Sequence, residues 1–382
     1  MNGIFIPDLH IGAMPIEQLK KEFKIIEDYY LKTEVDLSVI GGDFFDHKLY
    51  ANSEYISFAM YAMNFILSHS KVTRVVYGTR SHEWDQYTIF AELAGKMNYD
   101  YKVIKFITEE EIMGLKILYI PEEYIYSKDE YYSDFLNKED EYDYVFGHGV
   151  ISDVMEKAVK HSDKKSDRLK VPVFTAGELD RICRGKVYFG HYHIYTNIND
   201  KIYYGGSYSR YEFGQEKEKG FIAFKYDDGN YEDNFVINTE ALNYITVGFG
   251  IGDNILYDEN KFYKRIQTLK ENKNNYYDKL RIMVYIPDDH DNPEYIIQTL
   301  QESFKNNDNI KILITNSKDK KIRENTKEKI KEYMENYSFI FDKNLSREDI
   351  TSRYLLKHEG YELSKEDVNM YITKDLQYIL SV

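Results

Sequence analysis

The feature that most constrains the fold is an alternation of strand-like and helix-like stretches over residues 1 to about 195. Short apolar runs rich in β-branched and aromatic residues are typical of buried strands. Such runs occur at Ile4–Pro7, Leu37–Ile40, Arg74–Tyr77, Ile117–Ile120, Tyr144–Phe146 and Val187–Phe189. Between them, apolar residues recur at helical spacing, as at Ile16, Leu19, Phe23 and Ile26. The alternation predicts an α/β fold with a βαβ-type sheet and helical crossovers.

From Ile202 onward the pattern changes to short strand-like stretches separated by turn signals. We expect an antiparallel second sheet that completes a domain of residues 1–240, with strands at Ile202–Tyr204, Phe221–Tyr226 and Phe235–Asn238. Residues 241–317 predict a small α+β domain, with strands at Tyr244–Val247, Leu280–Ile286 and Ile310–Ile314 and a helix within Glu294–Phe304. Residues 318–382 predict a helical region with amphipathic helices at Ile350–Leu356 and Val368–Leu380. The run of charged residues and asparagines from Asn316 to Lys331 is either solvated surface or an interaction surface.

Composition excludes several classes of site and partner. The single cysteine, Cys183, excludes an internal disulfide framework and a cysteine-based zinc cluster, which leaves histidine, aspartate and asparagine as metal ligands. A formal net charge of −15 disfavours a protein that grips DNA by neutralising phosphates alone, so metals or a partner would have to assist. Because neither a signal-peptide pattern nor a bilayer-length apolar run occurs, we expect a cytoplasmic protein without a membrane partner.

Polar residues follow the predicted strands at the points where the strands end, and ligands bind at the carboxyl ends of strands in open α/β sheets. The segments are Asp8-Leu9-His10, Gly41 to Asp46, Gly78 to Glu83, Gly147-His148 and Gly190-His191-Tyr192-His193. A lone Asp-x-His pair is more often a turn with a surface histidine than a ligand pair. The joint pattern is informative, because six of the ten histidines lie in or beside these segments.

This inventory suits two divalent cations about 3.5 to 4 Å apart, which need a shared carboxylate, further nitrogen and oxygen ligands, and open positions for water and a phosphate oxygen. We assign Asp43 as the shared carboxylate, because it follows two glycines on a central strand. The remaining ligands divide into Asp8, His10 and His193 for one cation and His148 and His191 for the other. The pair of cations would lower the pKa of a bound water from ~15.7 toward about 7, so the expected nucleophile is water.

His82 suits a different role, since one oxygen must leave with a proton when a phosphodiester is cleaved and an imidazole can supply it. We predict that His82 is the general acid; the alternative is a loop histidine that Glu83 caps or orients. His47 is either a substrate contact or an exposed loop residue. The remaining histidines are interpreted as surface residues.

Together these segments resemble the calcineurin-like metallophosphoesterase superfamily and, within it, the SbcD-type nucleases, the bacterial and phage counterparts of the Mre nuclease. The nuclease likeness rests on the Gly-Ser-x-x-Arg segment within Tyr204 to Arg210 and on Lys219-Gly220-Phe221. The likeness covers roughly residues 1–240 by motif and the rest only by layout. It implies a four-layer α/β/β/α sandwich with a small capping domain and a helical tail, two divalent metal ions with Mn²⁺ as the expected metal, and substrate contacts from Ser207 and Arg210.

The resemblance also implies exonuclease and endonuclease activity on DNA, in end processing, recombination or repair. It implies an SbcC-type coiled-coil ATPase partner that docks on the helical region of residues 318–382, and a homodimer. Two alternatives stay open: a phosphodiesterase of small molecules or cyclic nucleotides with the same metal site, and a catalytically weakened scaffold subunit.

The third segment departs from the family pattern of Gly-Asn-His followed by Asp or Glu. Two residues are inserted between Gly78 and His82, and no asparagine is present. A hydroxyl oxygen from Ser81 or Thr79, or a water, would replace the amide ligand, and we name Ser81 as the candidate. Arg80 is predicted to bind a phosphate of the substrate, for which a guanidinium fork is suited.

Overall fold

The computed structural model describes residues 1–154, 170–215, 217–249, 278–286 and 310–316, with isolated positions between 264 and 302. The chain divides into two compact units, of which the first comprises Met1–Val247, Glu271–Arg281 and Asn307–Lys311. Every candidate site residue lies in this first unit. The predicted boundaries after residues 240 and 317 stay predictions, and the predicted tail of residues 318–382 lies outside the described residues.

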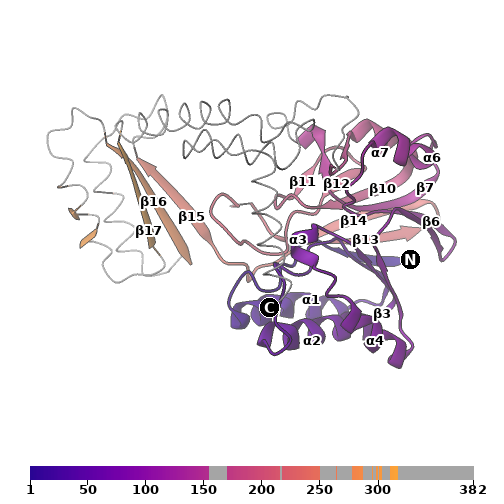
Figure 1. Cartoon of the computed structure of the whole chain (residues 1–382), viewed down its shortest axis with the longest axis horizontal. Coiled ribbons are helices and arrows are strands. Elements are labelled where there is room, and N and C mark those ends of the chain that lie inside the picture. The colour runs from indigo at the N-terminus through magenta and orange to yellow at the C-terminus, as the bar shows by residue number, and fades with distance from the viewer. Residues whose placement is uncertain are drawn as a thin grey trace, which may run out of the picture. The chain divides into compact units, whose positions relative to one another are not determined.

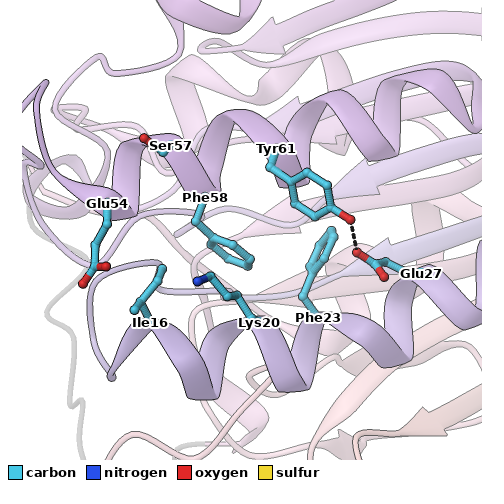
Figure 2. A pocket seen from close by; sticks show the side chains of 8 residues that line it. All are labelled: Ile16, Lys20, Phe23, Glu27, Glu54, Ser57, Phe58 and Tyr61. Carbon is cyan, nitrogen blue, oxygen red and sulfur yellow. Dashed lines mark hydrogen bonds between the residues drawn. The ribbon is translucent and has the colours of Figure 1, made fainter.

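The first six-stranded sheet contains the amino-terminal strands in the order β14-β13-β1-β2-β3-β4. Its parallel strands are β1 (Asn2–Ile6), β2 (Val35–Ile40), β3 (Ser70–Val76) and β4 (Asp100–Ile104). The helices α1 (Ile16–Tyr30), α2 (Glu54–Ser68) and α4 (Thr88–Met97) cover one face of this sheet (Figure 1). The predicted helical spacing is confirmed, since Phe23 and Ile26 of α1 are buried in this layer. A groove of about 460 Å³ lies between α1 and α2, where Tyr61 donates a hydrogen bond to Glu27 (Figure 2).

The second six-stranded sheet has the order β11-β12-β10-β7-β6-β5. Its strands are β5 (Thr108–Ile112), β6 (Leu115–Ile120), β7 (Tyr142–His148), β10 (Cys183–Gly190), β11 (Thr196–Asn197) and β12 (Ile202–Tyr204). The helices α6 (Ser133–Leu136) and α7 (Ala176–Ile182) pack against one face, and side chains such as Phe146 and Tyr188 on the other face share an apolar core with Phe5 and Phe224 of the first sheet. The predicted α/β class is therefore confirmed.

The predicted antiparallel second sheet is wrong. The strand β12 pairs in parallel with β10, whereas β13 (Gly220–Asp227) joins the first sheet antiparallel to β1 and forms a hairpin with β14 (Asn230–Ile237). The first five residues of β13 are all buried, and a strand buried on both faces suits an interior position better than a half-exposed sheet. The strands β4 and β5 were not predicted, because at a sheet edge they carry exposed polar residues and lack the continuous apolar run of the interior strands.

Smaller elements complete the described chain. The strands β15 (Tyr244–Phe249), β16 (Lys279–Ile286) and β17 (Ile310–Asn316) form a three-stranded sheet in that order, and all three were predicted. The remaining elements are α3 (Arg80–Glu83), α5 (Lys128–Tyr131), β8 (Val150–Ile151), η1 (Ser152–Val154) and β9 (Val173–Phe174). The helix predicted within Glu294–Phe304 falls mostly outside the described residues. Within the part of the chain that is described, no helix combines the length and apolar character needed to cross a membrane.

Candidate metal centre

The carboxyl ends of strands from both sheets meet at one place. The residues there are Asp8 after β1, Asp43 after β2, Thr79 after β3, Glu122 after β6, His148 at the end of β7 and His191 after β10. Glycines allow the ends to approach, because a Cβ on Gly42 would lie 2.2 Å from Nδ1 of His148 and one on Gly190 would lie 2.3 Å from the Gly41 carbonyl oxygen. The strand ends therefore converge in the structure as predicted.

The backbone is strained at four of the predicted ligands. Asp8, His10, Asp43 and His191 have φ angles of 37°, 45°, 47° and 101°, in a region that side-chain-bearing residues seldom adopt. Each such residue costs on the order of 1 to 3 kcal/mol, which the surrounding structure must offset. The strained turns aim these side chains at a common point instead of along the sheet.

The first ligand group consists of Asp8, His10 and His193. The Nε2 atoms of His10 and His193 lie 3.0 Å apart, and Oδ1 of Asp8 lies 4.0 and 3.8 Å from them. Asp8 is held by the backbone N–H of His191, which donates to both carboxylate oxygens. Burial and the charge of His10 lower the pKa of His193 to about 3, so its imidazole is in the neutral form that binds metals.

The second group consists of Glu122, His148 and His191. Oε2 of Glu122 lies 3.2 Å from Nδ1 of His191 and 3.8 Å from Nε2 of His148. Nδ1 of His148 donates to the Gly41 carbonyl at 2.7 Å, which fixes the ring so that Nε2 faces the group.

Asp43 lies between the two groups. Its Oδ2 atom is 3.4 Å from Nε2 of His148 and 3.9 Å from Nε2 of His10, while Oδ1 accepts a 2.6 Å hydrogen bond from the backbone N–H of Thr79. One carboxylate therefore faces a histidine of each group, as a shared ligand must.

The charges of this centre are unbalanced. Asp8, Asp43 and Glu122 are buried, and among the described residues no lysine or arginine forms a salt bridge with them. Burial raises the pKa of Asp8 well above its usual value. Burial also opposes ionisation of Asp43, but the adjacent His148 holds the pKa of Asp43 below its usual range, and Asp43 in turn raises the pKa of His148 to about 10 against the effect of burial. The field that retains a proton on His148 also attracts cations, and mixed carboxylate and imidazole donors suit Mn, Fe or Zn.

His82 and Asp46 lie beside the first group. The Nδ1 side of the His82 ring is hydrogen-bonded to the Asp46 carbonyl oxygen, and its ring centroid lies 4.8 Å from that of His10. Nε2 is then the nitrogen that can exchange a proton. Glu83 does not orient this ring in the described contacts: its carboxylate accepts from the Gly78 N–H, and burial with the nearby charge of Asp43 raises its pKa to about 8.

Thr79, and not Ser81, supplies the hydroxyl of the third segment. The Thr79 Oγ1 atom lies 3.2 Å from Oε2 of Glu122 and 3.5 Å from Nε2 of His148. Ser81 is exposed in α3 and lines a neighbouring cleft. The prediction that Ser81 is a metal ligand is therefore wrong. The inserted residues form part of the short helix α3, and in this helix Ser81 is exposed.

The predicted substrate contacts occupy different surroundings. Arg80 is exposed beside the centre, and exposed His47 pairs with Asp46 at 2.9 Å. The buried Ser207 hydroxyl donates to the Ser209 carbonyl and accepts from Lys219, and Arg210 donates to backbone carbonyls that include that of Gln215. Ser207 and Arg210 therefore support the loop around His193. Ser207 contacts Lys219, which also donates to the His193 carbonyl, and Arg210 contacts Gln215, whose side-chain amide is hydrogen-bonded to the His193 ring.

Glu122 is a candidate ligand that was not predicted from the sequence. It follows the predicted strand Ile117–Ile120, separated from it only by Pro121. The rule that identified the other ligands, a charged residue directly after a buried strand, applies equally to Pro121-Glu122-Glu123.

Comparisons with known proteins do not assign the chain to a family. No family model and no curated protein matches it. Among solved structures it is similar to the protein of unknown function AQ665 from Aquifex aeolicus, at 17% sequence identity and a TM-score of 0.22, over 38% of this chain and 76% of that one. A likeness at this level supports no inference about fold or function.

Proposed function

We propose that the chain is a two-metal phosphodiesterase of the calcineurin-like metallophosphoesterase superfamily, built on a four-layer α/β/β/α sandwich. The observation that carries the proposal is Asp43, whose carboxylate lies within 4 Å of a histidine from each ligand group. Two sheets that share an apolar core, each with helices packed on it, support the sandwich.

In this function Asp8, His10, Asp43 and His193 would hold one cation, and Asp43, Glu122, His148 and His191 the other. When bound, two such cations supply an acidified water and neutralise charge on a phosphate. The chain's own residues orient the substrate and move the leaving proton. His82, anchored through Nδ1, donates that proton, and the exposed guanidinium of Arg80 contacts a phosphate.

We further propose that the substrate is DNA and that the chain is an SbcD-type nuclease subunit that uses Mn²⁺ in the cytoplasm. The motif likeness of Tyr204 to Arg210 and of Lys219 supports an SbcD-type nuclease. The segment also contacts the candidate metal centre, because Lys219 donates hydrogen bonds to the His193 carbonyl and the Ser207 hydroxyl. Residues 241–317 would form the capping domain. Residues 318–382 would bind an SbcC-type ATPase, and two nuclease subunits would form a dimer.

The test is hydrolysis by the purified chain with Mn²⁺ of bis-p-nitrophenyl phosphate, a cyclic nucleotide and end-labelled DNA, with a chelator control. Cleavage of the chromogenic diester and of DNA is expected. Turnover of the cyclic nucleotide without DNA cleavage would favour a small-molecule enzyme. Failure on all substrates with metal bound and an ATPase partner supplied would favour the scaffold.

A further inference from the structure

A cleft of about 1030 Å³ adjoins the metal centre. Glu122 belongs both to the second ligand group and to the wall of this cleft, so the cleft borders the candidate metal centre. The cleft is large for a site that takes a drug-sized ligand, since such sites measure about 300 to 1,000 Å³. It therefore has room for more than the phosphate that the metal centre would take.

The walls of this cleft present aromatic rings to solvent. Trp84, Phe106 and Tyr124 are 55%, 68% and 43% exposed. Trp84 ends α3 with a φ of 42°, a left-handed conformation that is strained for a bulky residue. Large apolar side chains are thus exposed to water beside the candidate metal centre, which is unfavourable, and one of them also has a strained backbone.

The charges around these rings leave cations available to a polyanion. Two of the three acidic wall residues have internal partners, because Asp85 pairs with Lys105 and Glu123 accepts hydrogen bonds from the Ile107 N–H and the Tyr131 hydroxyl, while the third, Glu122, faces the histidines of the second ligand group. Nζ of Lys48 lies 5.7 Å from the Trp84 ring centroid. Arg80 is exposed, and no described residue forms a salt bridge with it.

We propose that this cleft stacks the unpaired bases of a nucleic-acid strand whose phosphate enters the metal centre, an inference that rests on the proposed function. Every base has a flat π face, so aromatic walls bind a strand without reading its sequence. Bases paired inside a duplex are not open to such stacking, which makes single strands and frayed ends the preferred substrate. Stacking also provides affinity that a chain of net charge −15 does not gain from phosphate neutralisation.

Trp84 is the only tryptophan in the chain, so its fluorescence reports occupation of the cleft. The full chain is titrated in Mg²⁺ with a phosphorothioate-linked octathymidylate, which resists hydrolysis, and with the same backbone lacking bases. We expect saturable quenching by the base-bearing strand and much weaker binding of the abasic one. By anisotropy of labelled strand, Trp84→Ala lowers affinity about 5- to 150-fold and Trp84→Phe largely retains it.

Tyr61→Ala is the matched control, because Tyr61 is 51% exposed and lines the groove between α1 and α2; its strand affinity is expected to equal that of the wild type. Equal affinity for the abasic strand, or unchanged affinity of Trp84→Ala, overturns the proposal. If thymidine monophosphate binds as tightly as the octamer, the cleft binds a small nucleotide and the proposal of a nucleic-acid strand is overturned. Failure of the proposed function is recognised separately, as the absence of Mn²⁺-dependent hydrolysis of bis-p-nitrophenyl phosphate by the wild type, a substrate that the control Tyr61→Ala is expected to hydrolyse normally.

Discussion

The two ends of the neighbouring strands β7 and β10 balance buried charge in different ways. At their amino ends, Asp143 of β7 accepts hydrogen bonds of 2.8 and 2.7 Å from the guanidinium of Arg184 in β10, and a third from the Tyr231 hydroxyl. At their carboxyl ends, His148 and His191 face acids that lack a lysine or arginine partner among the described residues. In the first cluster the buried carboxylate is neutralised by a side chain of the protein. In the second cluster the buried carboxylates are neutralised only by bound protons or metal cations.

This difference distinguishes a structural ion pair from a candidate metal site. A buried carboxylate with a bidentate guanidinium has its charge and its lone pairs satisfied within the fold. Carboxylates that face only imidazoles are balanced by protons, and metal cations compete for the same positions. Backbone strain occurs at Asp8 and Asp43 in the second cluster, but Asp143 has no positive φ. We therefore expect substitutions in the two clusters to affect different measurements.

The largest contrast is expected between Asp43→Asn and Asp143→Asn. Asp43→Asn removes the carboxylate that faces both ligand groups, so Mn²⁺-dependent hydrolysis of bis-p-nitrophenyl phosphate should fall below detection. Asp143→Asn should keep its turnover number while the free energy of unfolding falls. Turnover of folded protein and urea unfolding measure the two effects, and similar turnover losses in both variants would break the comparison.

His82→Gln tests whether the rim of the metal centre moves a proton. Loss of a general acid costs about 10²- to 10⁴-fold in rate when the leaving group needs protonation. We expect such a loss on DNA but a much smaller one on bis-p-nitrophenyl phosphate, because nitrophenolate leaves without a proton. Turnover on both substrates is measured at saturating Mn²⁺. Equal losses on the two would assign His82 to structure or metal binding instead.

Glu122→Gln sharpens the ligand assignment at the carboxyl ends. The variant keeps the shape of the side chain and removes the charge that faces His148 and His191, so Mn²⁺ affinity of the second group should fall about 10- to 100-fold. Calorimetric titration should then resolve one tight Mn²⁺ site, whereas two are expected for the wild type. Ser81→Ala is the matched control, since Ser81 points outward and should leave both affinities unchanged. Two tight sites in Glu122→Gln would remove Glu122 from the ligand set.

Local sequence pattern was sufficient for the buried interior strands and for most of the candidate centre. Buried strands are apolar runs, and charged residues directly after them stand out, which is why Asp8, Asp43 and His148 were predicted to converge. Pairing between distant strands carries no comparable local signal. The strand β13 lies about 200 residues after β1 and still inserts beside it, so the division into two sheets was not predicted from the residues alone.

The position of a side chain within an irregular turn likewise could not be predicted from the sequence pattern. Spacing showed that two residues were inserted before His82, but it did not show that α3 would turn Ser81 outward and leave the Thr79 hydroxyl beside Glu122. Such a choice depends on backbone dihedral angles fixed by tertiary contacts, here the Thr79 N–H bond to Asp43.

The smallest expected effect concerns the amino ends. Arg184→Ala should lower the free energy of unfolding by about 1.5 to 3 kcal/mol, nearer the lower figure because the Arg184 side chain is 45% exposed. Burial alone would raise the pKa of Asp143, but Arg184 and Tyr231 hold that pKa below its usual value. A depressed carboxyl pKa contributes stability above the unfolded value of about 3.9, and this stability is lost as pH falls through the folded pKa.

The gap in unfolding free energy between wild type and Arg184→Ala should therefore be widest near neutral pH and narrow below about pH 4. Urea unfolding at both pH values measures it. Lys225→Ala, which removes an exposed ion pair with Asp227, is the control and should change stability little at either pH. A gap that stays constant across the range would mean that Arg184 stabilises the fold by packing and not by charge, and the two ends of β7 and β10 would then differ less than their geometry indicates.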